Sequence, residues 1–316
     1  MTTTIKKYRL VTRSDFDGLV CALLLKHLDI VDEVRFVHPK DMQDGKVKLT
    51  ERDLTTNLPY VPGVYMAFDH HQSEIIRNPG GHPNHVIHPE AASAARVVYN
   101  HYAGKKTFPH GWEDMLAAVD KCDCARFTRD EILHPGKWDL LNFIMDARTG
   151  LGRFRDFRVS NYRLMLDLID HCKSYPIDQI MQLPDVRERV DLYFEHEQKF
   201  TEQLKRCTAM RDNVAVLDLR KEEVIYAGNR FMIYALYPGT NISIHVLPGL
   251  KNRNTVFAMG KSIINRTATT NISELMLHFG GGGHENAGTC QVENERAGRV
   301  LQTLIAKAQA DERLKS

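Results

Sequence analysis

The sequence lacks a long apolar run, a cysteine framework and an excess of charge of either sign. Its longest apolar run, Leu19 to Leu25, falls well short of the roughly 20 residues that span a bilayer, and the first residues have no apolar core of signal-peptide length. The 6 cysteines show no paired spacing beyond Cys122 and Cys124, which favours reduced thiols over disulfides or a zinc site. These absences predict a cytoplasmic protein that does not bind a membrane.

The balance of charge excludes a protein that coats long nucleic acid. The 42 Lys and Arg residues against 40 Asp and Glu leave a formal net charge of +2, without a strongly basic footprint. Any nucleotide ligand is therefore expected to be short. With 316 residues, of which 43% are hydrophobic and 26% charged, the chain is long enough for about two domains with separate cores.

Acidic residues follow the first apolar strand in a pattern typical of a site at the edge of a sheet. A strand over Tyr8–Thr12 precedes Asp15, Asp17 and Gly18, and an apolar helix from about Leu19 to Leu28 comes next. Two aspartates at this spacing can direct both carboxylates at one point, and oxygen-rich sites favour magnesium or manganese over zinc. The alternative is that the aspartates only cap the helix. Repeated strand and helix units of this kind predict a parallel sheet.

The stretch Val64–His71 ends an apolar strand with three residues that are able to bind a metal. Asp69, His70 and His71 stop the apolar run abruptly. This is expected of a buried strand that delivers ligands to the carboxyl edge of a parallel sheet. A strand end whose polar residues are merely solvated is the alternative.

Beyond about residue 212, short strands and helices predict a second α/β domain. A long, charged and amphipathic helix from Val186 to Cys207 is expected to connect the domains. We predict a first domain over residues 1–185, a helical linker over 186–212 and a second domain over 213–316. The predicted strands of the second domain are Val214–Leu217, Val224–Tyr226, Ile242–Val246 and Thr255–Met259.

A run of four glycines marks the second domain. Gly280–Gly283 would expose backbone N–H groups and allow the close approach of an anion, and the adjacent His284 adds a donor. The run favours a cradle for a phosphate or carboxylate group, with a flexible loop as the alternative.

The order and spacing of these motifs resemble the DHH phosphoesterase superfamily with its C-terminal DHH-associated domain. Ser14–Gly18, Phe68–His71 and Gly280–Gly288 carry the resemblance, which covers nearly the whole chain. The superfamily includes nanoRNases that degrade short oligonucleotides and linear dinucleotides, RecJ-type exonucleases, exopolyphosphatases and type II pyrophosphatases. The resemblance implies an α/β fold with an N-terminal parallel-sheet domain, a helical linker and a smaller C-terminal α/β domain, with the active site in the interdomain cleft.

The resemblance also implies the roles of the site residues. The expected metal ligands are Asp15, Asp17, His70 and an Asp after an apolar helix, for which Asp123 is the first choice and Asp120 the second. His71 is expected to face the phosphate, with Asp69 supporting it. In the second domain the residues expected to bind the substrate are Gly281, Gly282, Gly283, His284 and Arg266.

Two departures from the family pattern concern the metal centre. Many members have a His where Arg13 stands and an Asp where Asn57 stands, so this chain adds two positive charges, the charge of one divalent cation. We therefore hypothesise one tightly bound metal, with Asn57 at a ligand position and the Arg13 guanidinium acting in catalysis by neutralising the phosphate. The alternative is an ordinary two-metal site completed by Asp53 or Asp41.

The predicted function is that of a metal-dependent hydrolase of the nanoRNase type. It would cleave short linear oligonucleotides or dinucleotides, such as pGpG or pApA, to mononucleotides. The expected cofactor is Mn²⁺ or Mg²⁺, with one or two ions per chain, and the expected partner is this nucleotide or another phosphate ester or anhydride. An exopolyphosphatase and a catalytically silent nucleotide-binding regulator are the alternatives, and a homodimer is left open.

Overall fold

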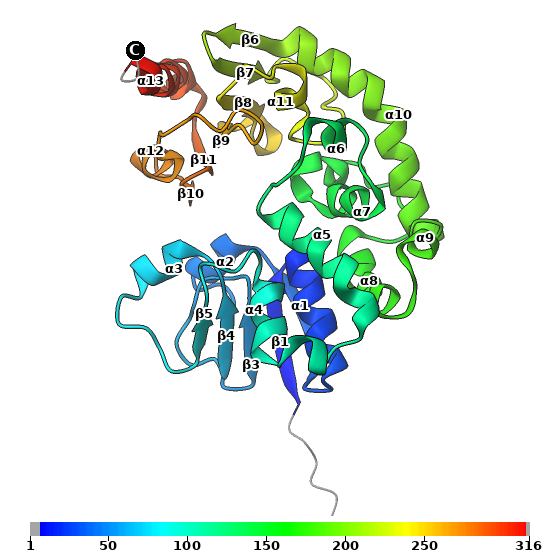
Figure 1. The fold of residues 1–316 in the computed structure, drawn as a ribbon. Helices are drawn as coiled ribbons and strands as arrows, with labels where there is room; N and C mark the ends of the chain where they lie inside the picture. Colours follow the sequence, from blue (N-terminus) through cyan, green and yellow to red (C-terminus); the bar gives the residue numbers. More distant parts are fainter. Residues whose placement is uncertain (1–6, 314–316) are drawn as a thin grey trace, which may run out of the picture. The chain divides into compact units, whose positions relative to one another are not determined.

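Two sheets, one in each half of the chain, organise the fold (Figure 1). The computed structural model describes residues 7–313, apart from the side chains of Lys40, Gln43, His284 and residues 311–313. The chain divides into two units: unit 1 comprises Met1–Arg126 and Pro135–Asp191, and unit 2 comprises Phe127–His134 and Leu192–Ser316. The predicted α/β class is confirmed in both units.

Unit 1 is built on a parallel sheet of five strands in the order β2-β1-β3-β4-β5. Its strands are β1 (Tyr8–Arg13), β2 (Val31–Val37), β3 (Asp53–Thr56), β4 (Met66–Asp69) and β5 (His85–Ile87). The chain passes from β1 to β2 on one side and returns with β3 on the other, so the strand order reverses between β1 and β3. The carboxyl ends of β1, β3 and β4 are therefore neighbours at the position where open parallel sheets bind ligands.

Helix α1 (Phe16–His27) is the central helix of unit 1. Every residue from Phe16 to Leu25 is buried, because α1 packs against β1 and against the helices α4, α5 and α8. A helix that is covered on several sides is apolar nearly all round, which explains its sequence. The other helices of this unit are α2 (Pro39–Gln43), α3 (Gln72–Arg77), α4 (Ala94–His101), α5 (Glu113–Asp123), α7 (Lys137–Met145), α8 (Asn161–Ser174) and α9 (Ile177–Ile180).

The sequence did not reveal strand β3, because three of its four residues, Asp53, Thr55 and Thr56, are polar although all four are buried. The hydroxyl of Thr12 donates to the Thr56 carbonyl at 3.1 Å, and the Thr56 hydroxyl donates to Thr12 Oγ1 at 2.7 Å. Asp53 accepts from Nε of Arg9 at 2.6 Å and from the backbone of Thr50 at 2.7 Å. Buried polar groups are tolerated when they have partners, and Thr56 and Asp53 have theirs on neighbouring segments, whereas Thr55 Oγ1 is buried without a hydrogen-bond partner among the described residues.

Unit 2 contains a mixed sheet of six strands in the order β10-β11-β9-β8-β7-β6, in which only β7 and β8 pair in parallel. Its strands are β6 (Thr208–Arg211), β7 (Val214–Asp218), β8 (Ile242–Pro248), β9 (Asn254–Lys261), β10 (Gly282–His284) and β11 (Ala287–Glu293). Its helices are α6 (Arg129–Leu133), α11 (Met232–Leu236), α12 (Ile272–His278) and α13 (Asn294–Arg313), and α10 (Pro184–Cys207) begins in unit 1 and ends in unit 2.

The predicted domain boundaries at residues 185 and 212 stay a prediction. Among the helices within residues 7–313, none has the length and apolar character to cross a membrane.

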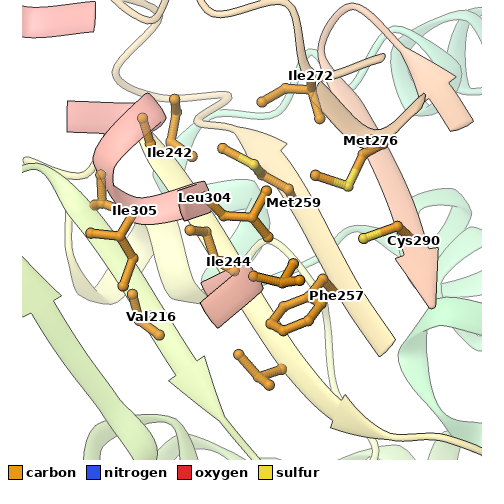
Figure 2. Close-up of a cluster of buried hydrophobic side chains, with 14 of the residues drawn as sticks. Val216, Ile242, Ile244, Phe257, Met259, Ile272, Met276, Cys290, Leu304 and Ile305 are labelled. Atoms are coloured by element: carbon orange, nitrogen blue, oxygen red, sulfur yellow. The ribbon is translucent and has the colours of Figure 1, made fainter. Parts of the chain in front are cut away.

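One face of the unit 2 sheet forms a core with α12 and α13. Ile242, Ile244 and Val246 of β8 are fully buried at alternate positions, which is the period expected of a strand with one face on a core. Figure 2 shows Ile242 and Ile244 of β8 in one cluster with Met276 of α12 and Leu304 of α13. Unit 2 therefore has a hydrophobic core of its own.

The predicted strand Val224–Tyr226 is wrong. The buried side chain of Gln203 on α10 donates to the Val224 carbonyl at 2.8 Å and accepts from the Tyr226 N–H at 3.1 Å. A side-chain amide thus supplies hydrogen bonds that a neighbouring strand would otherwise supply, so the segment needs no place in the sheet. Periodicity in the sequence cannot reveal such a partner.

The tight turn from β1 into α1 generates a stability prediction. A Cβ on Gly18 would lie 2.0 Å from the Arg13 carbonyl oxygen and 2.7 Å from Thr12 Oγ1. We expect Gly18→Ala to lower the free energy of unfolding by about 1–3 kcal/mol, the usual cost of overpacking. Urea unfolding measures this, with Gly111→Ala as the control because nothing lies within 4 Å of that Cβ. Equal stability of the two variants would contradict the prediction.

Candidate metal centre

Polar residues follow the carboxyl ends of three adjacent strands and converge with the end of one helix. Asp123 is the last residue of α5, and the strand ends contribute Arg13, Asp15 and Asp17 at β1, Asn57 at β3, and Asp69, His70 and His71 at β4. The contacts described below join these residues into one site within unit 1. The structure therefore brings together every residue that the sequence assigned to the site in the first domain.

Asp17 is held at the amino terminus of helix α4. Its Oδ2 accepts from the N–H of Ala94 at 2.9 Å and its Oδ1 accepts from the N–H of Ala95 at 2.7 Å. These are the first two residues of α4, where free N–H groups and the helix dipole favour a negative charge. Asp17 is only 3% exposed, so these bonds fix a carboxylate that has almost no access to solvent.

His70 lies between the carboxylates of Asp17 and Asp123. Nδ1 of His70 lies 3.2 Å from the carbonyl oxygen of Ala91, which fixes the proton on Nδ1 in the neutral ring. Nε2 lies 3.1 Å from Asp123 Oδ2, yet it is buried and has no hydrogen bond of regular geometry within residues 7–313. One potential ligand atom each from Asp17, His70 and Asp123 lies within 4.8 Å of the others. In the neutral ring, Nε2 of His70 has a lone pair that no hydrogen bond from the described residues occupies, and two carboxylates lie beside it. One nitrogen and carboxylate oxygens form a set of ligand atoms that fits a divalent cation.

Asp69 orients the second histidine. Its Oδ1 lies 2.7 Å from Nδ1 of His71 and also accepts from the N–H of His70 at 2.8 Å. Burial lowers the pKa of His71, but the hydrogen bond and the charge of Asp69 outweigh it, so the pKa is above its ordinary value. The pair therefore favours the protonated form of the His71 imidazole, with its Nδ1 held by Asp69.

Asp15 is engaged by several donors at once. Nε of Arg13 lies 2.9 Å from its Oδ2, and Nδ2 of Asn57 and the N–H of Gly18 donate to its Oδ1 at 3.1 and 2.9 Å. Burial raises the pKa of Asp15, and the charge of Arg13 opposes the rise. The Oδ1 atom of Asn57 is buried and has no hydrogen-bond partner among the described residues.

The two carboxylates nearest to His70 set the protonation of the centre. Burial and the charge of Asp123 raise the pKa of Asp17 to about 7. Burial lowers the pKa of His70, but its interactions with Asp123 and then with Asp17 outweigh this and raise the pKa to about 9. In the absence of a cation, His70 is therefore the positive charge that balances its acidic neighbours at neutral pH.

The other acidic candidates are engaged elsewhere. Asp120 accepts from the Ser93 hydroxyl at 2.7 Å and from Nη2 of Arg96 at 2.6 Å, so it ties α5 to α4. Asp41 pairs with Lys46 at 3.1 Å, and Asp53 binds Arg9 as described above. Asp123, the first choice of the sequence analysis, is the Asp of α5 that lies beside His70.

In unit 2 the glycine run forms a strand where the sequence suggested a loop or an anion cradle. Gly282–His284 form β10, which pairs with β11, and the Gly281 N–H donates to the carbonyl of Met276 at 2.9 Å. A Cβ on Gly281 or Gly283 would lie 2.1 or 2.3 Å from a carbonyl oxygen of the β11 segment. Close packing of the hairpin therefore accounts for glycine at these two positions. The side chain of His284 lies outside the described part of the structure, and Arg266 is exposed, with Nε donating to the Ile263 carbonyl at 3.0 Å.

Two charged residues near these motifs escaped the sequence analysis. Arg148 stands in a short 3₁₀ helix after α7, and its pKa is influenced by Asp15 and Asp123 of the site. In unit 2, Lys261 pairs with Glu285 at 3.0 Å, beside the end of β10. Neither residue belongs to a motif with a fixed spacing, so the sequence alone gives no signal for them.

The chain is similar to several proteins of known structure. A scan against models of known families and a search among curated proteins both find no match. The structure of the pGpG-specific phosphodiesterase PggH from Vibrio cholerae is 60% identical to this chain, covers 96% of it and 100% of its own length, and has a TM-score of 0.82. RecJ from Thermus thermophilus, in complex with Mn²⁺, is 15% identical over 97% of this chain and 52% of its own, with a TM-score of 0.55. CDC45 from Entamoeba histolytica is 8% identical over 96% of both chains, with a TM-score of 0.53. The last two similarities concern the fold alone.

The raised pKa of His70 generates a prediction about cation binding. A cation needs the neutral ring, whereas a pKa of about 9 keeps the ring protonated at neutral pH, so binding must release a proton. We expect manganese affinity to rise by about tenfold per pH unit for each released proton and to level off above the His70 pKa. Calorimetric titration at pH 7.5 in buffers of different protonation enthalpy measures the proton release. A manganese affinity that does not change between pH 7 and 9 would refute this assignment of His70.

Proposed function

The chain belongs to the DHH phosphoesterase superfamily, and from this premise we propose that it is a metal-dependent phosphodiesterase that hydrolyses short linear dinucleotides such as pGpG to mononucleotides. The observation that carries the proposal is the 60% identity to a pGpG-specific phosphodiesterase, which extends over 96% of this chain and 100% of that one. The centre in unit 1 supports it, because carboxylates, imidazoles and a guanidinium surround one point at the edge of the sheet.

We propose Mn²⁺ or Mg²⁺ as the cofactor, held by Asp17, His70 and Asp123. Hard carboxylate oxygens with a single imidazole suit these ions, and the buried Nε2 of His70 supplies the nitrogen. An ion bound there would lower the pKa of a water molecule and offset charge on the phosphoryl oxygens. The two N–H groups at the α4 terminus fix the carboxylate of Asp17, so the protein itself positions this ligand.

In this proposal the protein orients the phosphate and supplies a proton. Hydrolysis of pGpG adds water to the phosphorus atom and breaks its bond to the 3′ oxygen, which leaves with a proton and yields two GMP molecules. His71, held by Asp69, is protonated below its raised pKa and offers an N–H at Nε2 to an oxygen of the phosphate. Asp69 therefore acts through His71 rather than on the substrate.

We also propose one ion per chain. Asp15 already accepts from Arg13, Asn57 and Gly18, so its charge and its lone pairs are largely engaged. Arg13 binds Asp15 through Nε, which leaves its two terminal amino groups for a phosphate oxygen. A fixed guanidinium would then neutralise charge that a second ion neutralises in a two-metal site.

The roles of unit 2 remain proposals at this stage. The proposed contacts to the substrate are the backbone of Gly281, Gly282 and Gly283 and the side chains of His284 and Arg266. The location of the site in an interdomain cleft and the homodimer are likewise untested predictions. The proposed location is the cytoplasm, which suits the six cysteines, all of them free thiols.

The first test is an activity panel with manganese on the purified protein. We expect pGpG to be converted to GMP, and inorganic polyphosphate to be left intact. Asp17→Ala or His70→Ala should lower kcat at least about 100-fold, since even changes around a metal ligand cost 10–100-fold. Asp114→Asn is the matched control, because Asp114 is an exposed carboxylate on the same helix as Asp123.

The alternatives give different results in this panel. Release of phosphate from polyphosphate without cleavage of pGpG would indicate an exopolyphosphatase. Tight binding of pGpG without turnover would indicate a nucleotide-binding regulator. Full activity of the Asp17 or His70 variant would show that the centre lies elsewhere.

The second test counts the ions. Elemental analysis of the purified protein after manganese loading and dialysis should give close to one ion per chain. The double variant Arg13→His, Asn57→Asp should bring this number toward two, because it removes one positive charge, adds one negative charge and provides an imidazole and a carboxylate as ligands. Two tightly held ions in the natural protein, for instance with Asn57 Oδ1 as a ligand, would overturn the one-ion proposal.

A further inference from the structure

A second arginine of unit 1 is held in the same way as Arg13. Arg148 lies in a 3₁₀ helix (Ala147–Thr149) directly after α7, and α7 packs against α5, the helix that ends at Asp123. Nε of Arg148 donates to both oxygens of Asp146, at 2.7 and 3.0 Å. Arg13 likewise uses Nε for a single aspartate, Asp15. In both cases an ion pair holds one edge of the guanidinium group.

The other edge of the Arg148 guanidinium is available for binding. Within residues 7–313 its Nη1 and Nη2 make no hydrogen bond, and the side chain is 51% exposed, whereas its anchor Asp146 is 11% exposed. A buried arginine that serves only the fold satisfies its terminal amino groups within the protein. Arg189 is the example in this chain: it is fully buried and uses Nε, Nη1 and Nη2 in hydrogen bonds.

Arg148 also lies within electrostatic range of the metal centre. Partial desolvation of this half-exposed side chain lowers its pKa, but the charges of Asp146, and then of Asp15 and Asp123, outweigh this effect and raise the pKa. In return, its charge opposes the rise in the pKa of Asp15. By contrast, no carboxylate of the site influences Arg153, a neighbouring arginine whose pKa is lowered by burial alone.

We infer that Arg148 is a substrate-binding residue whose terminal amino groups bind a non-bridging oxygen of the nucleotide phosphate, alongside Arg13. Two guanidinium groups, each fixed by an aspartate, would form a preorganised phosphate site beside the cation, and their planar donor geometry matches phosphate oxygens. This inference rests on the proposed function, because it assigns the phosphate of that substrate to the same centre. It adds a ligand contact that lies outside the sequence motifs of the site.

The test measures how the substitution Arg148→Gln changes the affinity for a cation, manganese, and for an anion, GMP. We expect the two affinities to change in opposite directions. Arg148→Gln removes a positive charge near Asp15 and Asp123, so we expect manganese to bind roughly two- to tenfold more tightly. The same change removes charge-assisted hydrogen bonds to phosphate, so we expect the affinity for GMP to fall at least about tenfold in the manganese-loaded protein. Calorimetry measures both affinities without turnover. Arg148→Lys, which keeps the charge but loses the planar fork, should retain the natural manganese affinity and recover only part of the GMP affinity.

Arg153→Gln is the matched control and should leave both affinities unchanged. If Arg148 only stabilised the turn, Arg148→Gln would weaken manganese and GMP binding together and lower the melting temperature, and this result would overturn the inference. An unchanged GMP affinity would also overturn it. Because GMP binding does not depend on cleavage, a protein that fails to hydrolyse pGpG but loses GMP affinity on Arg148→Gln would refute the proposed function and retain the phosphate contact.

Discussion

The buried carboxylate of Asp17 is the constraint on which the centre depends. A carboxylate with 3% exposure is costly unless hydrogen bonds satisfy it, and here the first two N–H groups of α4 do so. This attachment fixes the start of α4 against the start of α1. Helix α4 then holds Asp120 of α5 through Ser93 and Arg96, and α5 ends one turn later at Asp123. One buried acid is thus connected, through two helices, to the position of the Asp123 carboxylate.

Charge compensation within the protein is the second organising feature. Three acids of the centre each have a nearby donor: Arg13 and Asn57 at Asp15, His71 at Asp69, and His70 at Asp123. Like charges so close together would otherwise destabilise the fold. Because these partners belong to the chain, the protein itself compensates the charges of the centre, and a pKa raised to about 9 keeps a proton on His70 among the carboxylates at neutral pH.

The sequence predicted those parts of the site that follow from local patterns. Apolar strands that end in acids and histidines identified Asp17, Asp69 and His70, because strand period and strand ends are local properties. It did not identify β3, whose buried Thr56 and Asp53 find their partners on β1, 44 positions away in the chain. It also assigned a strand to Val224–Tyr226, where the side chain of Gln203 satisfies the backbone.

The glycine run shows a different reason for failure. Four glycines suggested exposed N–H groups, but two of them are required because β11 passes within contact distance of their backbone. Arg148 was missed because an arginine outside a motif carries no signal until the fold places it near the acids of the site. In both cases the decisive contact joins residues whose proximity depends on tertiary structure.

The backbone conformation of Asn57 affects how the charge of such a centre can change during evolution. Its φ of 54° lies in the left-handed region, which asparagine and aspartate enter more readily than other residues with a side chain. An amide and an acid are therefore interchangeable here without any change in the course of the chain. A single base change between their codons would convert a hydrogen-bond donor for Asp15 into a charged ligand. At this strand end, a lineage can alter the charge of its centre in one step and keep a folded protein throughout.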